Sequence, residues 1–123
     1  MADTDQAAQL LIQSNRADTM QVDSRDGDRI GHVHAYMIQK RTGHALYVIL
    51  AFGGLMGIGK AFYPLPFKLL GYNPVEDRYV VTIDHRVLEG GPSWASNAPD
   101  FDQAYADRVA HYYGVGRKDL TLG

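Results

Sequence analysis

The chain has 123 residues, a length that predicts one compact domain. Hydrophobic residues make up 46% of it and charged residues 21%, values near the globular average that exclude a wholly disordered chain. Twelve Lys and Arg against 14 Asp and Glu give a net charge of -2, and there is no Cys. The composition therefore offers no basic excess for nucleic acid, no disulfide, no Cys-ligated zinc and no thiol nucleophile.

The N-terminus carries no targeting pattern. Asp3 and Asp5 stand where a secretory signal has basic residues followed by an apolar core. We therefore expect residues 1–10 to be a flexible N-terminus and the protein to be cytoplasmic. The longest charge-free apolar stretch, 45–59, has 15 residues and includes four glycines, whereas a membrane-spanning helix needs about 20 apolar residues. We expect no transmembrane segment.

Short strand patterns separated by turn residues predict a small barrel or sandwich. Met20 and Val22 alternate with polar neighbours and predict a first strand. Four more strands are predicted at residues 30–38, 44–52, 60–65 and 79–83, with turns at 25–28, 39–43 and 73–77. Pro64 and Pro66 remove backbone donors, so the fourth strand should lie at an edge or end of the sheet.

The third predicted strand is apolar on both faces. One face carries Leu46, Val48, Leu50 and Phe52, and the other carries Ala45, Tyr47, Ile49 and Ala51. An antiparallel strand of this kind needs cover on its outer side as well as a core on its inner side. The cover is expected to be either the chain's own tail or a second copy of the chain.

The tail is predicted to form an amphipathic helix. Asp100 can cap it, Gln103 follows at the spacing of a capping box, and Gly114 is placed to end it. Asp84 can likewise cap a single helical turn that ends near Leu88. The apolar residues of the tail helix share one stripe, with spacings of four, four and three: Phe101, Tyr105, Val109 and Tyr112.

The glycine-rich segment 54–60 matches the spacing of a phosphate-binding loop, G-x4-G-K, and follows a strand. Ala61 stands where that loop has a Ser or Thr for magnesium, and Pro64 and Pro66 prevent the helix that should follow. A loop that joins two strands is the simpler interpretation. Its apolar side chains could belong to the core, contact a partner or touch a membrane surface: Leu55, Met56 and Ile58.

No catalytic or metal-binding site emerges from the remaining polar residues. His32 and His34 share one strand face, but the predicted hairpin leaves His44 too far away to join them, which favours solvent-facing histidines. Asp23, Asp26 and Asp28 alternate with arginines and indicate a solvated turn, since no calcium-binding loop of the EF-hand type is present. We expect no catalytic residue, metal or cofactor.

Read in order, five motifs resemble the PRC-barrel family. They are DGDRIGHV at 26–33, RTG at 41–43, AFGGLMGIGK at 51–60, LPFKLL at 65–70 and LEGGPSW at 88–94. The family includes the cytoplasmic domain of the H protein of the photosynthetic reaction centre and a barrel in the ribosome maturation factor. A Trp followed by a helix that ends in Tyr112-Tyr113-Gly114 is similar to the tail of stand-alone bacterial members.

This resemblance implies a mainly β fold: a small, strongly bent antiparallel barrel over residues 11–94, followed by a C-terminal helical tail at 95–123. It implies an assembly and docking surface without catalytic residues. The chain lacks both the membrane helix of the reaction-centre protein and the companion domain of the maturation factor, so neither specific role transfers.

The leading hypothesis is a non-enzymatic protein-interaction module that self-associates or docks onto a larger complex, without binding nucleic acid on its own. One alternative is a small-ligand or nucleotide-binding protein that uses 54–60. Another, resting on family analogy, is an adaptor in ribosome maturation or photosynthetic electron-transfer assembly. The candidate contact residues are Tyr47, Ile49, Ala51, Leu55, Met56, Ile58, Phe101, Tyr105, Val109 and Tyr112.

Overall fold

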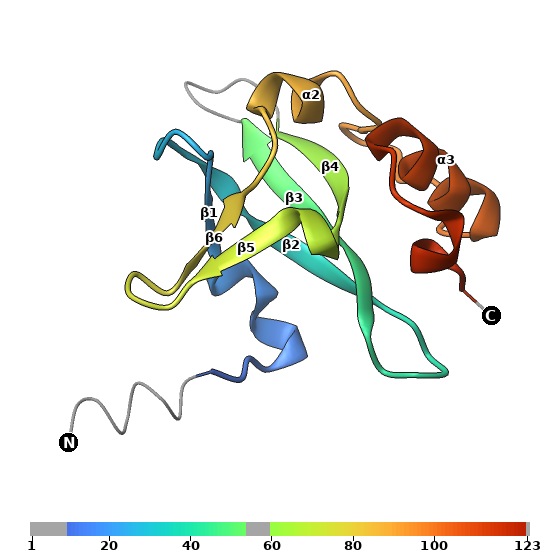
Figure 1. Ribbon diagram of the computed structural model, residues 1–123, viewed down its shortest axis with the longest axis horizontal. Coiled ribbons are helices and arrows are strands. Elements are labelled where there is room, and N and C mark those ends of the chain that lie inside the picture. Colours follow the sequence, from blue (N-terminus) through green and yellow to red (C-terminus); the bar gives the residue numbers. More distant parts are fainter. Residues whose placement is uncertain (1–9, 54–59, 123) are drawn as a thin grey trace.

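A single curled sheet of six strands forms the body of the protein in the computed structural model, which describes residues 10–53 and 60–122 (Figure 1). The order across the sheet is β4-β3-β2-β1-β6-β5. The strands are β1 (Gln21–Asp23), β2 (Arg29–Ile38), β3 (Ala45–Gly53), β4 (Lys60–Pro66), β5 (Leu70–Asn73) and β6 (Arg78–Val81). The mainly β, strongly bent sheet confirms the predicted fold class.

Two features of the sheet differ from the sequence prediction. The sequence pattern does not predict β5, because four residues that include Gly71 carry no readable alternation between apolar and polar positions. β1 and β6 pair in parallel, whereas the other neighbouring strands pair antiparallel as expected. The edge position of β4 agrees with its two prolines.

The hairpin of β2 and β3 has two irregularities in its register. Val33 pairs with Leu50 and Ala35 with Ile49, so His34 has no directly opposed residue. Near the turn, Met37 pairs with Tyr47 and Ile38 with Ala45, so Leu46 has no directly opposed residue. His34 is thus an extra residue on β2, and Leu46 is an extra residue on β3. Each one bends its own strand and increases the local twist, which helps to curl the sheet.

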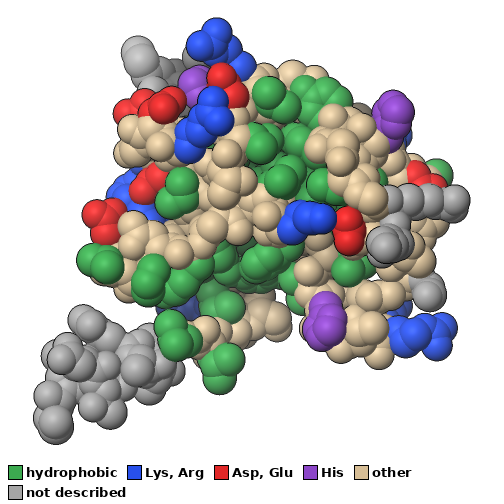
Figure 2. Space-filling view, viewed as in Figure 1, with side chains coloured by type: hydrophobic (Ala, Val, Ile, Leu, Met, Phe, Trp, Pro, Cys, Tyr) green, Lys and Arg blue, Asp and Glu red, His purple; other side chains and the backbone are tan. Residues whose placement is uncertain are grey.

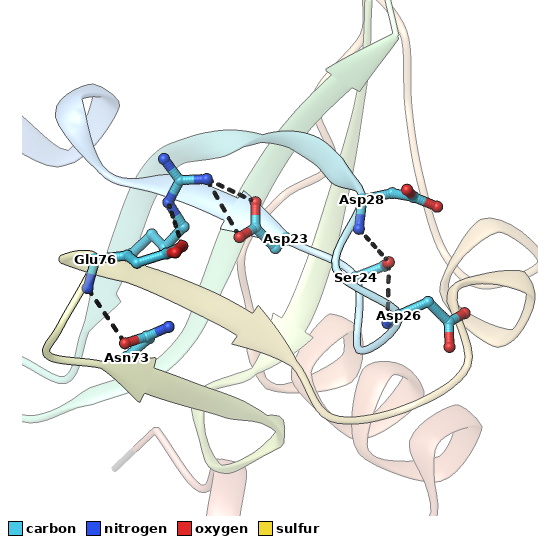
Figure 3. A network of polar contacts seen from close by, with 7 residues as sticks. Asp23, Ser24, Asp26, Asp28, Asn73 and Glu76 are labelled. Carbon is cyan, nitrogen blue, oxygen red and sulfur yellow. Dashed lines mark hydrogen bonds and ion pairs between the residues drawn. The ribbon is translucent and has the colours of Figure 1, made fainter.

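The parallel pair β1–β6 is tied together by one ion pair between neighbouring strands (Figure 3). Nη1 of Arg78 donates to both carboxylate oxygens of Asp23 at 3.3 Å. The predicted turns also form: the Ser24 hydroxyl accepts two backbone N–H groups in the β1–β2 loop, and the Asn73 side chain accepts two in the β5–β6 loop. The Asp residues of the first turn thus flank a structural loop.

The sheet curls around an inner core to which β1–β6, α2 and the 3-10 helix η1 (Ser14–Thr19) contribute. The helix α2 (His85–Glu89) is capped by Asp84, as predicted, through a bond from the backbone N–H of Arg86. The buried side chains of the inner core are Ala17, Met20, Val22, Val33, Val48, Leu50, Leu65, Leu70, Tyr79, Val81 and Leu88.

The tail forms the helix α3 (Gln103–Tyr113) and the 3-10 helix η4 (Arg117–Leu120). Asp102 caps α3 and not Asp100, because the Asp102 carboxylate reaches the backbone N–H of Tyr105 at 2.9 Å. Gln103 does not close a capping box. Its side chain contacts Asp107 and the backbone at residues 120 and 122. Gly114 ends the helix as predicted, at φ 69°.

Candidate protein-interaction surface

The tail of the same chain covers the outer face of β3 (Figure 1). Tyr47, Ile49 and Ala51 are each about 1% exposed. An outer cluster packs Tyr47 and Ile49 against α3 and η4 through Tyr105, Ala106, Val109, Ala110 and Leu120. Leu46, predicted for the inner face, packs against this outer cluster at the twisted start of β3. Both apolar faces of β3 are therefore covered within one chain, and its residues make internal contacts.

The remaining candidate residues lie at the ends of the tail helix or beyond the described residues. Phe101 and Tyr112 are each 39% exposed. The Phe101 ring makes edge contacts with Trp94 and Tyr105, so part of it already serves to dock the tail. Leu55, Met56 and Ile58 fall outside the described part of the chain.

A surface that the sequence analysis missed lies at the other end of the chain. Leu10, Leu11 and Ile12 are 65%, 91% and 38% exposed. They line one side of a groove of about 440 Å³, which we call the N-terminal groove. Apolar side chains gather there, over the N-terminal segment and the β5–β6 hairpin, at the lower left of Figure 2. The available signal was this run of three apolar residues, which lies across the boundary between the expected flexible end at 1–10 and the expected barrel at 11–94.

Aromatic rings contribute to the lining of the N-terminal groove. Phe67, Tyr72 and Tyr79 line it, and the ring of Tyr79 makes edge contacts with both of the others. The Tyr79 hydroxyl shares a 2.9 Å hydrogen bond with that of Tyr36, and burial raises the pKa of Tyr36 well above its usual value. These contacts fix the rings, so the aromatic side of the groove is preformed in the barrel.

Two further hollows extend the N-terminal groove towards the tail. A hollow of about 350 Å³ shares Phe67 with the groove, and one of about 210 Å³ shares Leu46 with that hollow. Ile38 and Phe101, both partly exposed, line the last one. We call the three together the apolar belt.

The charged residues that line the apolar belt are Arg16, Lys40, Lys68, Asp77 and Asp119. Lys68 bonds Asp119 at 3.1 Å beside the middle hollow and ties the barrel to the tail. Asp77 accepts a 2.7 Å hydrogen bond from the Tyr72 hydroxyl, which raises the pKa of Tyr72. Within residues 10–53 and 60–122, Arg16 in the groove has no ion pair.

The phosphate-loop alternative has no support from the described residues. Residues 54–59 lie outside them, and Lys60 pairs with Gly53 as the first residue of β4. A phosphate-binding loop leads into a helix whose N-terminal amides help to hold the anion, whereas this segment leads into an edge strand. His34, one of the two candidate strand histidines, is exposed, and its ring packs at a tilt against that of Phe62 with ring centres 4.7 Å apart.

The described residues also bear on two other kinds of function. They hold no cluster of three or more His, Cys, Asp or Glu placed to bind a metal ion. Their helices are all too short or too polar to span a membrane.

The comparisons with known proteins agree with the fold. The family model of the PRC-barrel domain matches residues 15–88, more than half of the chain. The match runs from η1 through α2, so it includes all six strands and the aromatic side of the N-terminal groove. No curated protein sequence matches the chain.

Proposed function

Because the chain belongs to the PRC-barrel family, whose domains mediate protein interactions, we propose that it is a non-enzymatic interaction module that self-associates or docks onto a larger complex. The observation that carries this proposal is the exposure of Leu10, Leu11 and Ile12 beside a groove whose aromatic side is preformed. Contiguous exposed apolar surface on a small domain is typical of a binding site. The apolar belt gives a partner room to continue past the groove.

The distribution of shifted pKa values supports a role without catalysis. Active sites gather perturbed titratable groups in one cleft. Here the shifted tyrosines lie in separate places, and each shift has a structural cause. Burial raises the pKa of Tyr47 and of Tyr105 to about 12 in the outer cluster beneath the tail. Beside the N-terminal groove, burial raises the pKa of Tyr36, and the hydrogen bond to Asp77 raises that of Tyr72. The pKa of Asp84 is lowered by the backbone N–H of Arg86, which makes this carboxylate a helix cap.

A matched pair of surface substitutions tests the proposal. Leu11 and Val75 are both 91% exposed, but only Leu11 lines the N-terminal groove. We expect the wild-type chain and Val75→Asp to form a stoichiometric complex, with themselves or with a protein captured from lysate, and Leu11→Asp to lose it. Light scattering after size-exclusion chromatography measures self-association, and quantitative capture from lysate measures binding of another protein. Equal behaviour of the two variants would contradict the proposed surface.

A further inference from the structure

We infer that the N-terminal groove binds a second copy of this chain, so that Leu11 of each copy enters the groove of the other across a two-fold axis. The inference rests on the proposed function and specifies the partner of the same surface. The first support is the shape of the surface. The exposed side chain of Leu11 lies directly beside a hollow lined by Leu10, Phe67 and Tyr79.

Two-fold pairing requires a patch that is complementary to itself, because the same residues face each other from both sides. A protrusion and a hollow at neighbouring positions meet that requirement, since rotation about an axis between them places each protrusion in the opposite hollow. Leu11, 91% exposed, is the protrusion, and the groove of about 440 Å³ is the hollow. The volume exceeds that of a leucine side chain and leaves room for Leu10 or Ile12.

The charges of the groove favour the same partner. Arg16 and Asp77 both line it. Arg16 has no ion pair within the described ranges, and Asp77 uses one carboxylate oxygen, Oδ1, to accept from Tyr72. A groove with only a cation would select an acidic partner. A groove with one cation and one anion can place Arg16 of each copy against Asp77 of the other.

The backbone and side chain of Asp77 are already fixed before such a contact forms. It adopts φ 54°, in the left-handed region, within the β5–β6 turn. Asp tolerates this conformation better than most residues. The Tyr72 hydroxyl then fixes the carboxylate at the rim of the groove. The carboxylate therefore loses little conformational entropy when a cation arrives.

The size of the contact surface sets the expected strength of self-association. A standard interface buries about 800 Å² on each partner, and the whole chain exposes 7943 Å². The groove is a local feature, so pairing also has to draw on the adjoining part of the apolar belt through Phe67. An interface at the small end of the range associates weakly, and we expect a monomer–dimer equilibrium with a dissociation constant on the order of micromolar.

Sedimentation velocity of the full chain over a concentration series tests the inference. The wild type and Val75→Asp should shift from monomer to dimer over the same concentrations, and Leu11→Asp should stay monomeric. Arg16→Asp and Asp77→Lys should each weaken self-association by about tenfold or more, because each creates two like-charge contacts in the homodimer.

Mixing the two charge variants gives the decisive measurement. In a mixed dimer, Asp at position 16 of one chain faces Lys at position 77 of the other, and the second contact pairs Arg16 with Asp77. We therefore expect a heterodimer that forms more tightly than the homodimer of either charge variant. Circular dichroism confirms that each variant is folded, and Asp77→Asn serves as a second variant that keeps the turn and removes the charge.

The outcomes separate this inference from the proposed function. A wild-type chain that stays monomeric at every concentration, or a dimer that Leu11→Asp leaves intact, would overturn the two-fold pairing. So would folded charge variants that fail to form the heterodimer. If the chain is monomeric and Leu11→Asp abolishes capture of a different protein, this inference fails while the proposed function stands. If Leu11→Asp changes neither self-association nor the capture of a different protein, this inference and the proposed function both fail.

Discussion

The Tyr112 hydroxyl donates a 2.6 Å hydrogen bond to the backbone carbonyl of Val87 and so fastens the last turn of α3 to α2. Gly91 lies against the same ring, where a Cβ would come within 2.8 Å of Tyr112 Cε2. At the other end of the tail, Trp94 exchanges two backbone hydrogen bonds with Phe62 on β4. The tail is therefore attached to the barrel at Trp94, ahead of α3, and at the last turn of α3, as well as along the buried face of the helix.

The first prediction concerns this attachment. Tyr112→Phe removes the bond to Val87 and should lower the free energy of unfolding by about 0.5–1.5 kcal/mol. Because the bond joins the tail to the barrel, amide hydrogen exchange should accelerate in the last turns of α3. Tyr72→Phe removes a phenol bond in the β5–β6 hairpin and is the matched control. Unchanged exchange in α3 for Tyr112→Phe would mean that the bond does not hold the tail.

The second prediction concerns the face of α3 that covers β3. Val109 is fully buried in the outer cluster, whereas Ala104 is exposed on the same helix. Val109→Asp places an unpaired carboxylate against Ile49 and Tyr47, so we expect a loss of about 3 kcal/mol or more and binding of a hydrophobic dye. Ala104→Asp should change stability by less than about 0.5 kcal/mol. Urea denaturation measures both, and similar losses would contradict the docked position of the tail.

The sequence carried enough information for the barrel strands because their signals are local. Alternation in residues 30–38 and 44–52 predicts β2 and β3 to within one residue, and the double-sided apolar pattern of β3 correctly predicts that both faces are covered. The apolar stripe of the tail predicts which side of α3 is buried through Tyr105 and Val109. Whether the cover comes from the same chain depends on the path of the linker, which no periodicity records.

The N-terminal groove could not be predicted because it depends on contacts distant in sequence. Leu10–Ile12 meets Tyr72 and Asp77 only after β6 pairs in parallel with β1, and that pairing involves strands of three and four residues. Strands this short give little pattern, and parallel pairing leaves no hairpin turn to reveal it. The wrong choice of Asp100 as the cap of α3 has a similar cause. An Asp at position 100 or at position 102 satisfies the local rule for helix capping, and the structure uses Asp102.

The third prediction concerns Gly31 on β2. A Cβ at this position would lie 2.2 Å from the backbone oxygen of Ala51 and 2.6 Å from Cβ of Phe52. Both are atoms that cannot move without shifting β3, so Gly31→Ala should cost about 1–3 kcal/mol or more. Gly71→Ala is the control, because the nearest atoms to its Cβ would lie at 3.7 and 3.8 Å and β5 needs no positive φ there. Thermal unfolding compares them, and an equally stable Gly31→Ala would contradict the close approach of β2 to β3.

The fourth prediction concerns the alkaline limit of stability. Burial raises the pKa of Tyr47 and of Tyr105 from 10.0 to about 12, and both phenols lie between β3 and α3. The folded state therefore holds these protons more tightly than the unfolded chain. Their contribution to stability is fully present below pH 10 and is lost as the pH rises from 10 to about 12. We expect cooperative unfolding in this range, together with the ultraviolet absorbance of tyrosinate.

Tyr105→Phe separates ionisation from packing. The Tyr105 hydroxyl is buried and has no hydrogen-bond partner among the described residues, so its removal takes away a desolvated polar atom and keeps the ring. Replacing an unsatisfied buried hydroxyl by hydrogen can be neutral or stabilising. At neutral pH the variant should therefore unfold at the same temperature as the wild type or higher, and its alkaline midpoint should move up. A loss of stability at neutral pH would show that the Tyr105 hydroxyl has a hydrogen-bond partner in the fold. An unchanged alkaline midpoint would show that ionisation of Tyr105 does not set the alkaline limit of stability.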